Sequence, residues 1–265
     1  MGPAAHALVS IDRSERDVAW RALEDGAVVG SGRARSRPDR RCFLAIDTWR
    51  TDVFDELLQT MAHELTQDLF TTIDEADGER LDQWSGRGFT VNRRENEYLI
   101  PTDPEITRLR IAAPPTGLRI VSAAVVDEGR LRQLDEVLRE DVPGSDGWIN
   151  DPQEFGEYTF DPRHFDAATY LVAVEQTGGG FVGLARIWKA PGRPRLGLIG
   201  VVPGHRRRGV ARALLAAALL ALHERGVPEI EAEADTANQP SIRLLDSLGA
   251  RRTGGAVELV RRHQQ

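Results

Sequence analysis

The chain has 265 residues, of which 41% are hydrophobic and 28% charged, with a formal net charge of −7. This length allows two domains of ordinary size, and the acidic balance disfavours general nucleic-acid binding, which needs a basic surface. A single cysteine excludes an internal disulfide and fits a cytoplasmic protein, while the longest apolar run, residues 211–222, is too short to span a membrane.

The first half of the chain is predicted to be a small α/β domain. Its expected elements are, in chain order, a hairpin (18–23 and 27–32), a strand (42–46), a helix (51 to about 68), a strand (70–73), a short helix (79–84) and a last strand (90–100). The turn Glu24-Asp25-Gly26 is typical of a hairpin. Thr51 is the expected N-cap of the long helix.

A junction follows over residues 101–117, where four prolines and a glycine favour extended, non-helical backbone. Such composition is typical of a segment between domains. We therefore predict one domain over residues 1–113 and a second over 114–265.

The second half adds an opening strand and helix to a similar order of elements. The expected elements are a strand (118–123), a helix (127–140), an irregular segment (141–168), a hairpin (170–175 and 181–188), a central strand (196–202), a helix (209–225), a strand (229–235) and a helix that Asn238 opens and Gly249 ends. From the hairpin onward this order repeats that of the first half. The first half is thus interpreted as a truncated, degenerate copy of one fold, the alternative being an unrelated α/β domain.

The long segment 141–168 is rich in aromatic residues, including Phe155, Phe160 and Phe165. Loops of this length in compact domains often bind ligands or move. Two interpretations remain open, one in which the segment lines a substrate cleft and one in which its aromatics pack on the first domain.

The stretch from Leu196 to Leu215 predicts an anion site. A buried strand leads through a Pro-Gly break and three arginines, Arg206, Arg207 and Arg208, into a helix that starts near Gly209. The first turn of a helix leaves backbone N–H groups without partners and carries a partial positive charge. Phosphate of a small molecule is therefore expected here, rather than a solvated loop or a nucleic-acid contact.

The pattern Arg206-x-x-Gly209-x-Ala211, preceded by Val201-Val202-Pro203, resembles the coenzyme A pyrophosphate loop of the GCN5-related N-acetyltransferases (GNAT). Neither G-x-x-x-x-G-K-[ST] nor a dinucleotide fingerprint is present. Downstream, Asn238-x-x-Ser241-x-x-Leu244 and Leu248-Gly249 resemble the second coenzyme-binding segment of that family. The resemblance implies an α/β (α+β) fold of two tandem GNAT-like domains, each a mixed central sheet flanked by helices.

The resemblance also implies roles for particular residues. Acetyl-coenzyme A would be the cosubstrate, with no metal. The expected contacts are Val201 and Val202 with the pantetheine arm, Arg206, Arg207, Arg208, Gly209, Val210 and Ala211 with the pyrophosphate, and Asn238 and Ser241 near the thiol.

Glu233 is the expected catalytic base. In the strand 229–235, alternation places four carboxylates on one face and apolar residues on the other. Neighbouring acids should raise the pKa of Glu233 toward neutrality. Its position, five residues before Asn238, matches the glutamate base of the branch that acetylates ribosomal-protein N-termini, while the alternative is a solvated acidic strand.

Leu245 departs from the family pattern. It stands seven residues after Asn238, where the family commonly has a tyrosine that acts as general acid. Either the thiolate leaves unprotonated, or another residue such as Tyr158, Tyr170 or Ser241 supplies the proton, or catalysis has lapsed.

The first half is not expected to bind coenzyme. Where its phosphate loop should fall, residues 47–56 read DTWRTDVFDE, with no glycine and four carboxylates that would repel a pyrophosphate. A structural or substrate-shaping role is predicted for this half.

The sequence thus predicts a cytoplasmic acetyl-CoA-dependent N-acetyltransferase, a monomer or homodimer, acting on a small-molecule amine by direct attack in a ternary complex. The acidic strand suggests a cationic acceptor such as an amino-sugar antibiotic. The alternatives are a catalytically lapsed coenzyme-binding module and a protein N-terminal acetyltransferase, and no nucleic-acid or membrane partner is expected.

Overall fold

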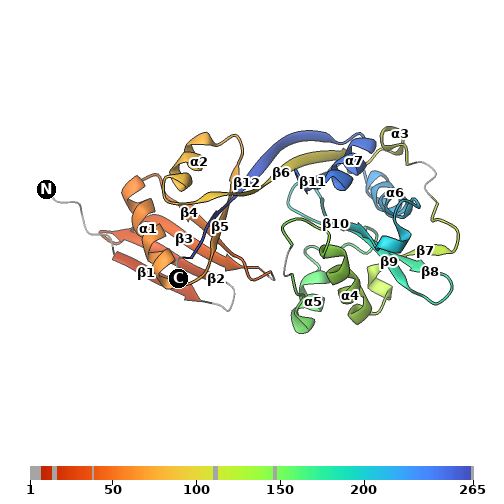
Figure 1. The fold of residues 1–265 in the computed structure, drawn as a ribbon, viewed down its shortest axis with the longest axis horizontal. Coiled ribbons are helices and arrows are strands. Elements are labelled where there is room, and N and C mark those ends of the chain that lie inside the picture. Colours follow the sequence, from red (N-terminus) through yellow and green to blue (C-terminus); the bar gives the residue numbers. More distant parts are fainter. Residues whose placement is uncertain (1–6, 14–16, 38, 110–112, 146–147, 264–265) are drawn as a thin grey trace. The chain divides into compact units, whose positions relative to one another are not determined.

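The computed structural model describes residues 7–13, 17–37, 39–109, 113–145 and 148–263 (Figure 1). The chain divides into two compact units. Met1–Arg94 and Ala256–Gln265 form the first, called the N-terminal unit, and Glu95–Gly255 form the second, called the C-terminal unit. The division differs from the predicted boundary near Pro114, for a reason given by the strand pairing below.

The N-terminal unit is a sheet with two helices. Its elements are β1 (Ala7–Arg13), β2 (Asp17–Glu24), β3 (Ala27–Ser36), β4 (Cys42–Asp47), α1 (Thr51–Glu64), β5 (Leu69–Asp74), α2 (Gly78–Ser85), the start of β6 (Thr90–Pro101) and the end of β12 (Arg251–Arg261). The strand order is β1-β2-β3-β4-β5-β12, in which only β4 and β5 are parallel.

Two details of this unit differ from the sequence prediction. Strand β1, which pairs with β2, was not expected. The N-cap of α1 is Arg50 rather than Thr51, and the helix ends at Glu64 because Leu65 adopts an extended conformation. The residues that follow, Thr66-Gln67-Asp68, offer no apolar side chain to continue the buried face of the helix.

Helix α1 packs one face on the sheet, through Val53, Phe54, Leu57, Leu58 and Met61, all of them buried. Helix α1 lies close to the backbone of β3. A Cβ added to Gly32 of β3 would lie 2.6 Å from the sulfur of Met61, which explains a glycine inside a strand.

The C-terminal unit is a mixed sheet covered on both faces. Its elements are the rest of β6, α3 (Pro104–Thr107), β7 (Leu118–Ser122), a 3₁₀ turn (Ala123–Val125), α4 (Glu128–Arg139), α5 (Pro152–Thr159), β8 (Tyr170–Glu175), β9 (Phe181–Trp188), β10 (Arg195–Val201), a 3₁₀ turn (Pro203–His205), α6 (Val210–His223), β11 (Glu229–Asp235), α7 (Gln239–Ser247) and the start of β12. The strand order is β6-β11-β10-β9-β8-β7. The predicted α/β class, with helices flanking a mixed sheet, is confirmed.

Two short helices occupy segments that were predicted to be non-helical or irregular. In both, an aspartate caps the helix and a proline takes its first position, where the missing N–H has no cost. Asp103 accepts from the Glu105 N–H at 2.8 Å to start α3, and Asp151 accepts from the Gln153 N–H at 2.8 Å to start α5.

Alternate residues of β8 face two cores. Leu171 and Ala173 belong to the core under α6, while Tyr170, Val172 and Val174 belong to the core under α4 and α5. Figure 1 shows these helices around the strands of the unit. Phe155 is buried in the second core and Phe160 and Phe165 pack against it, so these aromatics of segment 141–168 pack within their own unit.

The two units repeat one topology and exchange their last strands. In the N-terminal unit, β3 is antiparallel to β4, and β4 is parallel to β5 over two residue pairs. In the C-terminal unit, β9 is antiparallel to β10, and β10 is parallel to β11 over two residue pairs. Strand β5 then pairs with β12, whereas β11 pairs with β6. Because β6 and β12 each run from one unit into the other, the units divide within these strands and not at the proline-rich junction.

A buried carboxylate holds several segments of the C-terminal unit together. Asp135 of α4, 0% exposed, accepts from Arg139 Nε at 2.6 Å and from Asn150 Nδ2 at 3.0 Å, and lies 3.3 Å from Arg186 of β9. Burial alone would raise the pKa of Asp135, but the two arginines and the Asn150 bond outweigh it and hold that pKa below its usual value.

We expect Asp135→Ala to destabilise the protein by about 3–5 kcal/mol, because it leaves two buried guanidinium groups without their counter-charge. Urea denaturation followed by circular dichroism measures the loss. Glu136→Gln, which removes a part-exposed carboxylate from the next residue of α4 and its pair with Arg132, is the matched control and should cost at most about 0.5 kcal/mol. Equal losses in the two variants would contradict a special role for Asp135.

Candidate functional site

The site begins where β10 and β11 separate. The two strands pair only at Arg195 with Glu231 and Leu196 with Ala232, and a β-bulge bends β10 between Leu196 and Leu198. Beyond the bulge β10 stays paired with β9 and β11 with β6. In the described residues, each strand therefore turns an unpaired backbone edge toward the gap, where it can bond an extended ligand.

The loop after β10 ends in a helix N-terminus that faces open space. Arg207 and Gly209 adopt left-handed conformations, with φ of 62° and 83°, and a Cβ added to Gly209 would meet nothing within 4 Å. Gly209 is the N-cap of α6, and its carbonyl accepts the first helical bond, from the Ala213 N–H at 3.0 Å. The N–H groups of the preceding turn are thus available to an anion.

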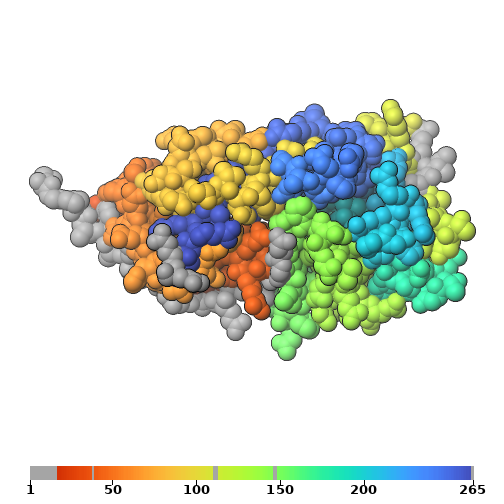
Figure 2. Space-filling view, in the orientation of Figure 1, coloured from red at the N-terminus to blue at the C-terminus, as the bar shows by residue number. Residues whose placement is uncertain are grey.

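A cleft of about 680 Å³ connects the gap and the loop. Its walls come from the end of α4, from β10, from the first turn of α6 and from α7. Figure 2 shows the α4–α5 segment in green, α6 in light blue and α7 in blue meeting at the surface of this unit.

Most of the sequence-predicted coenzyme residues line this cleft. They are Val201, Arg206, Arg207, Gly209, Val210, Ala211, Asn238 and Ser241. Val202 and Arg208 are not among the described residues of its lining. Val202 packs against both cores and donates its N–H to the Val182 carbonyl at 2.9 Å, and Arg208 is exposed.

Several residues that line the cleft were not predicted from the sequence. Arg212, Arg243 and Ser247 lie on the exposed sides of α6 and α7, and Asp141 follows α4. Helical periodicity could have placed Arg212 one turn into α6, beside the phosphate loop. Nothing local in the sequence indicated Asp141, which contacts Arg206 while the Arg206 Nε donates to the Val201 carbonyl at 2.8 Å.

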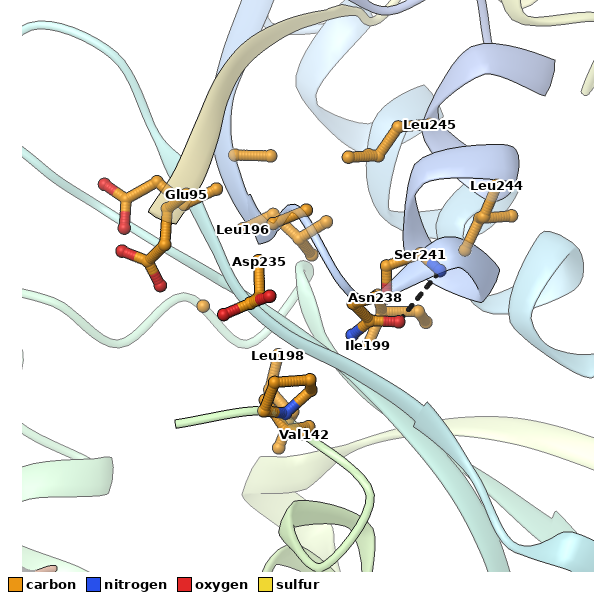
Figure 3. A pocket seen from close by; sticks show the side chains of 15 residues that line it. Glu95, Val142, Leu196, Leu198, Ile199, Asp235, Asn238, Ser241, Leu244 and Leu245 are labelled. Atoms are coloured by element: carbon orange, nitrogen blue, oxygen red, sulfur yellow. Dashed lines mark hydrogen bonds between the residues drawn. The ribbon is translucent and has the colours of Figure 1, made fainter. Parts of the chain in front are cut away.

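Asn238 has a structural role as well as a place in the cleft. It is the N-cap of α7, and its side-chain oxygen accepts from the Ser241 N–H at 3.2 Å (Figure 3). Both residues line the large cleft and also a smaller cavity of about 100 Å³ that adjoins it between β10, β11 and α7. The two cavities therefore share part of their walls.

The smaller cavity is apolar on one side and acidic on the other. Leucines of β10 and α7 form the apolar side, while Glu95 of β6 and Glu233 and Asp235 of β11 bring carboxylates to the other (Figure 3). Register explains the grouping, because Asp235 lies opposite Glu95, and Glu233 opposite Glu97. Such a cavity suits a positively charged group next to an apolar one.

The pKa of Glu233 is raised, which is the predicted direction, but the acids of its own strand are not among the causes. Desolvation is the main cause, and Glu95 and Glu97 add to it, while Arg195 of β10 lowers the pKa by contacting the Glu233 carboxylate. The side chain remains 35% exposed, so it can exchange protons with a ligand or with water. A raised pKa and access to solvent fit a general base.

No tyrosine replaces Leu245 in the described lining of either cavity. Leu245 itself is 3% exposed and lines the smaller one. Tyr170 is buried under α4, where burial raises the pKa of its hydroxyl to about 12, and Tyr158 is exposed on α5. Of the three predicted substitutes for the general acid, only Ser241 lines the site.

The corresponding loop of the N-terminal unit, between β4 and α1, is already neutralised. Its arginine, Arg50, donates to Asp52 at 2.6 Å and to Glu24 at 2.7 Å. Arg50 is thus engaged by two carboxylates, and the lack of a coenzyme site in this unit stays a prediction.

Within the described ranges, no helix is long and apolar enough to cross a membrane. Those ranges also hold no group of three or more histidine, cysteine, aspartate or glutamate side chains arranged to bind a metal.

One family model matches a part of the chain that lies within the C-terminal unit. The sequence model of the acetyltransferase (GNAT) family matches residues 131–250, which include every residue of the cleft loop and α7. No curated protein sequence matches the chain.

Solved structures with the same fold match nearly the whole chain. A GCN5-related N-acetyltransferase from Sphaerobacter thermophilus is 20% identical, with a TM-score of 0.70 over 96% of this chain and 83% of the other. A tandem GNAT protein from the clavulanic acid biosynthesis pathway is 16% identical, with a TM-score of 0.71 over 99% and 85%. The tandem arrangement predicted from the repeated element order agrees with this second similarity.

Proposed function

We propose that this protein transfers an acetyl group from acetyl-coenzyme A to a cationic small-molecule amine, since residues 131–250 match the model of the acetyltransferase (GNAT) family. The observation that carries the proposal is the divergence of β10 and β11 beside the open N-terminus of α6. This arrangement places a strand edge that can bind an extended pantetheine arm next to a helix N-terminus that can bind phosphate, within one cleft.

The residues of the cleft fit coenzyme A. The N–H groups of the first turn of α6 and the Arg207 guanidinium suit its pyrophosphate. The free edge of β10, from Leu198 to Val201, suits the amides of its pantetheine arm, since an extended chain can pair with an exposed strand edge. When bound, the coenzyme supplies a thioester, whose carbonyl an N–H of this edge would polarise.

Glu233 would prepare the acceptor. An ammonium group cannot attack a thioester until it loses a proton, and the Glu233 carboxylate, at the wall of the smaller cavity, would take that proton. The amine nitrogen would then bond to the acetyl carbon in a ternary complex while the carbon–sulfur bond breaks, and the nitrogen would release its second proton as the amide forms. With Leu245 at the position of the usual acid, that proton would reach the thiolate through Ser241 or water.

The carboxylates of the smaller cavity favour an acceptor with positive charge. Glu95, Glu233 and Asp235 lie within one cavity, and Arg195 contacts Glu233. An amino sugar or a polyamine would bring more than one cationic group to this acidic wall. A peptide N-terminus is the less favoured acceptor, because it offers a single charge.

A coenzyme-binding module without catalysis is the second candidate, and Leu245 is the observation that favours it. Isothermal titration of acetyl-coenzyme A, followed by thiol release with a panel of amino sugars, polyamines and peptides, separates the two. We expect one site per chain and thiol release with at least one cationic amine. Binding without release across the panel would favour the lapsed module, and no binding would overturn the proposal.

A further inference from the structure

The coenzyme cleft has more arginines than the pyrophosphate needs. Arg206, Arg207, Arg212 and Arg243 all line it, against one described carboxylate, Asp141. Asp141 is occupied, because Arg206 contacts it. The other three arginines therefore face the cleft without a carboxylate from its described lining.

Arg212 and Arg243 come from α6 and α7, the two helices that meet at one wall of the cleft. Arg212 of α6 donates to the Ser247 hydroxyl at 3.2 Å and to the Arg108 carbonyl at 3.4 Å. Ser247 follows Arg243 by four residues on α7, so the two share a face of that helix. The hydroxyl contact thus brings the Arg212 guanidinium to the helix face that carries Arg243.

The charge of this pair is not cancelled. Both acceptors of Arg212 are neutral oxygens, so they orient its guanidinium and leave its charge in place. Arg243 is exposed and makes no ion pair within the described ranges. Two cations on one wall, one of them fixed by neutral partners, suit a dianion better than a single charge.

We propose that Arg243, supported by Arg212, binds the 3′-phosphate of coenzyme A and selects donors that carry it. This inference rests on the proposed coenzyme site. A phosphate monoester carries a charge of about −1.5 to −2 at neutral pH, and it is separate from the pyrophosphate that the α6 N-terminus would take. The acyl donor is then a complete coenzyme A thioester and not a thioester of 3′-dephospho-coenzyme A or of a carrier-bound pantetheine, which lack that group.

Calorimetric titration of the full chain with acetyl-coenzyme A and with 3′-dephospho-acetyl-coenzyme A tests the proposal as a double-mutant cycle. The variants are Arg243→Gln and, as the matched control for charge, Arg119→Gln on an exposed position of β7. In Arg243→Gln we expect the Kd of acetyl-coenzyme A to rise about tenfold, since a charge-assisted bond is lost. The Kd of the dephospho ligand should change less than about twofold.

The outcomes separate this inference from the proposed function. Equal losses for both ligands, or no loss for either, would overturn the role of Arg243 while leaving the coenzyme site intact. If the parent protein binds neither ligand, the proposed function fails instead. Arg119→Gln should leave both affinities unchanged. A similar loss of affinity in Arg119→Gln would show that the effect of Arg243→Gln comes from net charge alone, and it would overturn the proposal.

Discussion

Gly209→Asp is expected to weaken acetyl-coenzyme A binding at least about 100-fold, a loss of about 2.7 kcal/mol. Gly209 has φ of 83° and opens onto free space in front of the α6 N-terminus. A carboxylate there would occupy the place of a phosphate and repel its charge, at a cost of about 4 kcal/mol for unit charges 4 Å apart at a protein surface. Isothermal titration calorimetry measures the loss.

Gly209→Asn separates charge from backbone strain. Asparagine has the shape of aspartate and tolerates the left-handed conformation, so this variant should lose only about tenfold in affinity. Gly204→Ala is the control for the loop, because Gly204 has no positive φ and an added Cβ would meet nothing within 4 Å. Similar affinities for Gly209→Asp and the parent would remove the loop from the coenzyme site.

Local patterns in the sequence were enough to predict where the two helices of the candidate site begin. A strand, a glycine at the start of a helix and an asparagine that caps the next helix are each determined by neighbouring residues. The structure accordingly places Gly209 and Asn238 as N-caps of α6 and α7. The acidic alternation of β11 likewise predicted the direction of the pKa shift of Glu233.

Features that depend on distant partners were not predictable in this way. The exchange of β6 and β12 between the units is a matter of which strand pairs with β5 and β11, and alternation within a strand does not specify its neighbour. The same limit hid Asp141, Arg243 and the position of Glu95 opposite Asp235. Helix α5 is a different case, because its start signal, Asp151-Pro152, is local and could have been recognised in the sequence.

Glu233→Gln is expected to lower kcat/KM for acetyl transfer at neutral pH by about 100-fold or more, as loss of a general base does. Glutamine keeps the size of the side chain but cannot accept the proton. In the parent, activity requires the ionised carboxylate, so kcat/KM should fall as pH drops below the raised pKa of Glu233. The variant should lose this acidic limb while its affinity for acetyl-coenzyme A stays within about twofold.

Glu231→Gln is the matched control, because Glu231 lies two residues away on the same face of β11, pairs with Arg193 at 3.8 Å and is not part of the described cavity lining. Its kcat/KM and pH profile should equal those of the parent.

The pH dependence of stability is a second test of the raised pKa of Glu233. Because folding raises the pKa of Glu233, the folded chain loses stability as pH rises from the ordinary value of 4.5 through the folded value. Glu233→Gln removes this loss, so the melting temperature of the variant relative to the parent should be higher at pH 8 than at pH 4. An unchanged pH profile in Glu233→Gln would assign the base to another residue, and Asp235 and Glu95, which line the same cavity, would be the next to substitute.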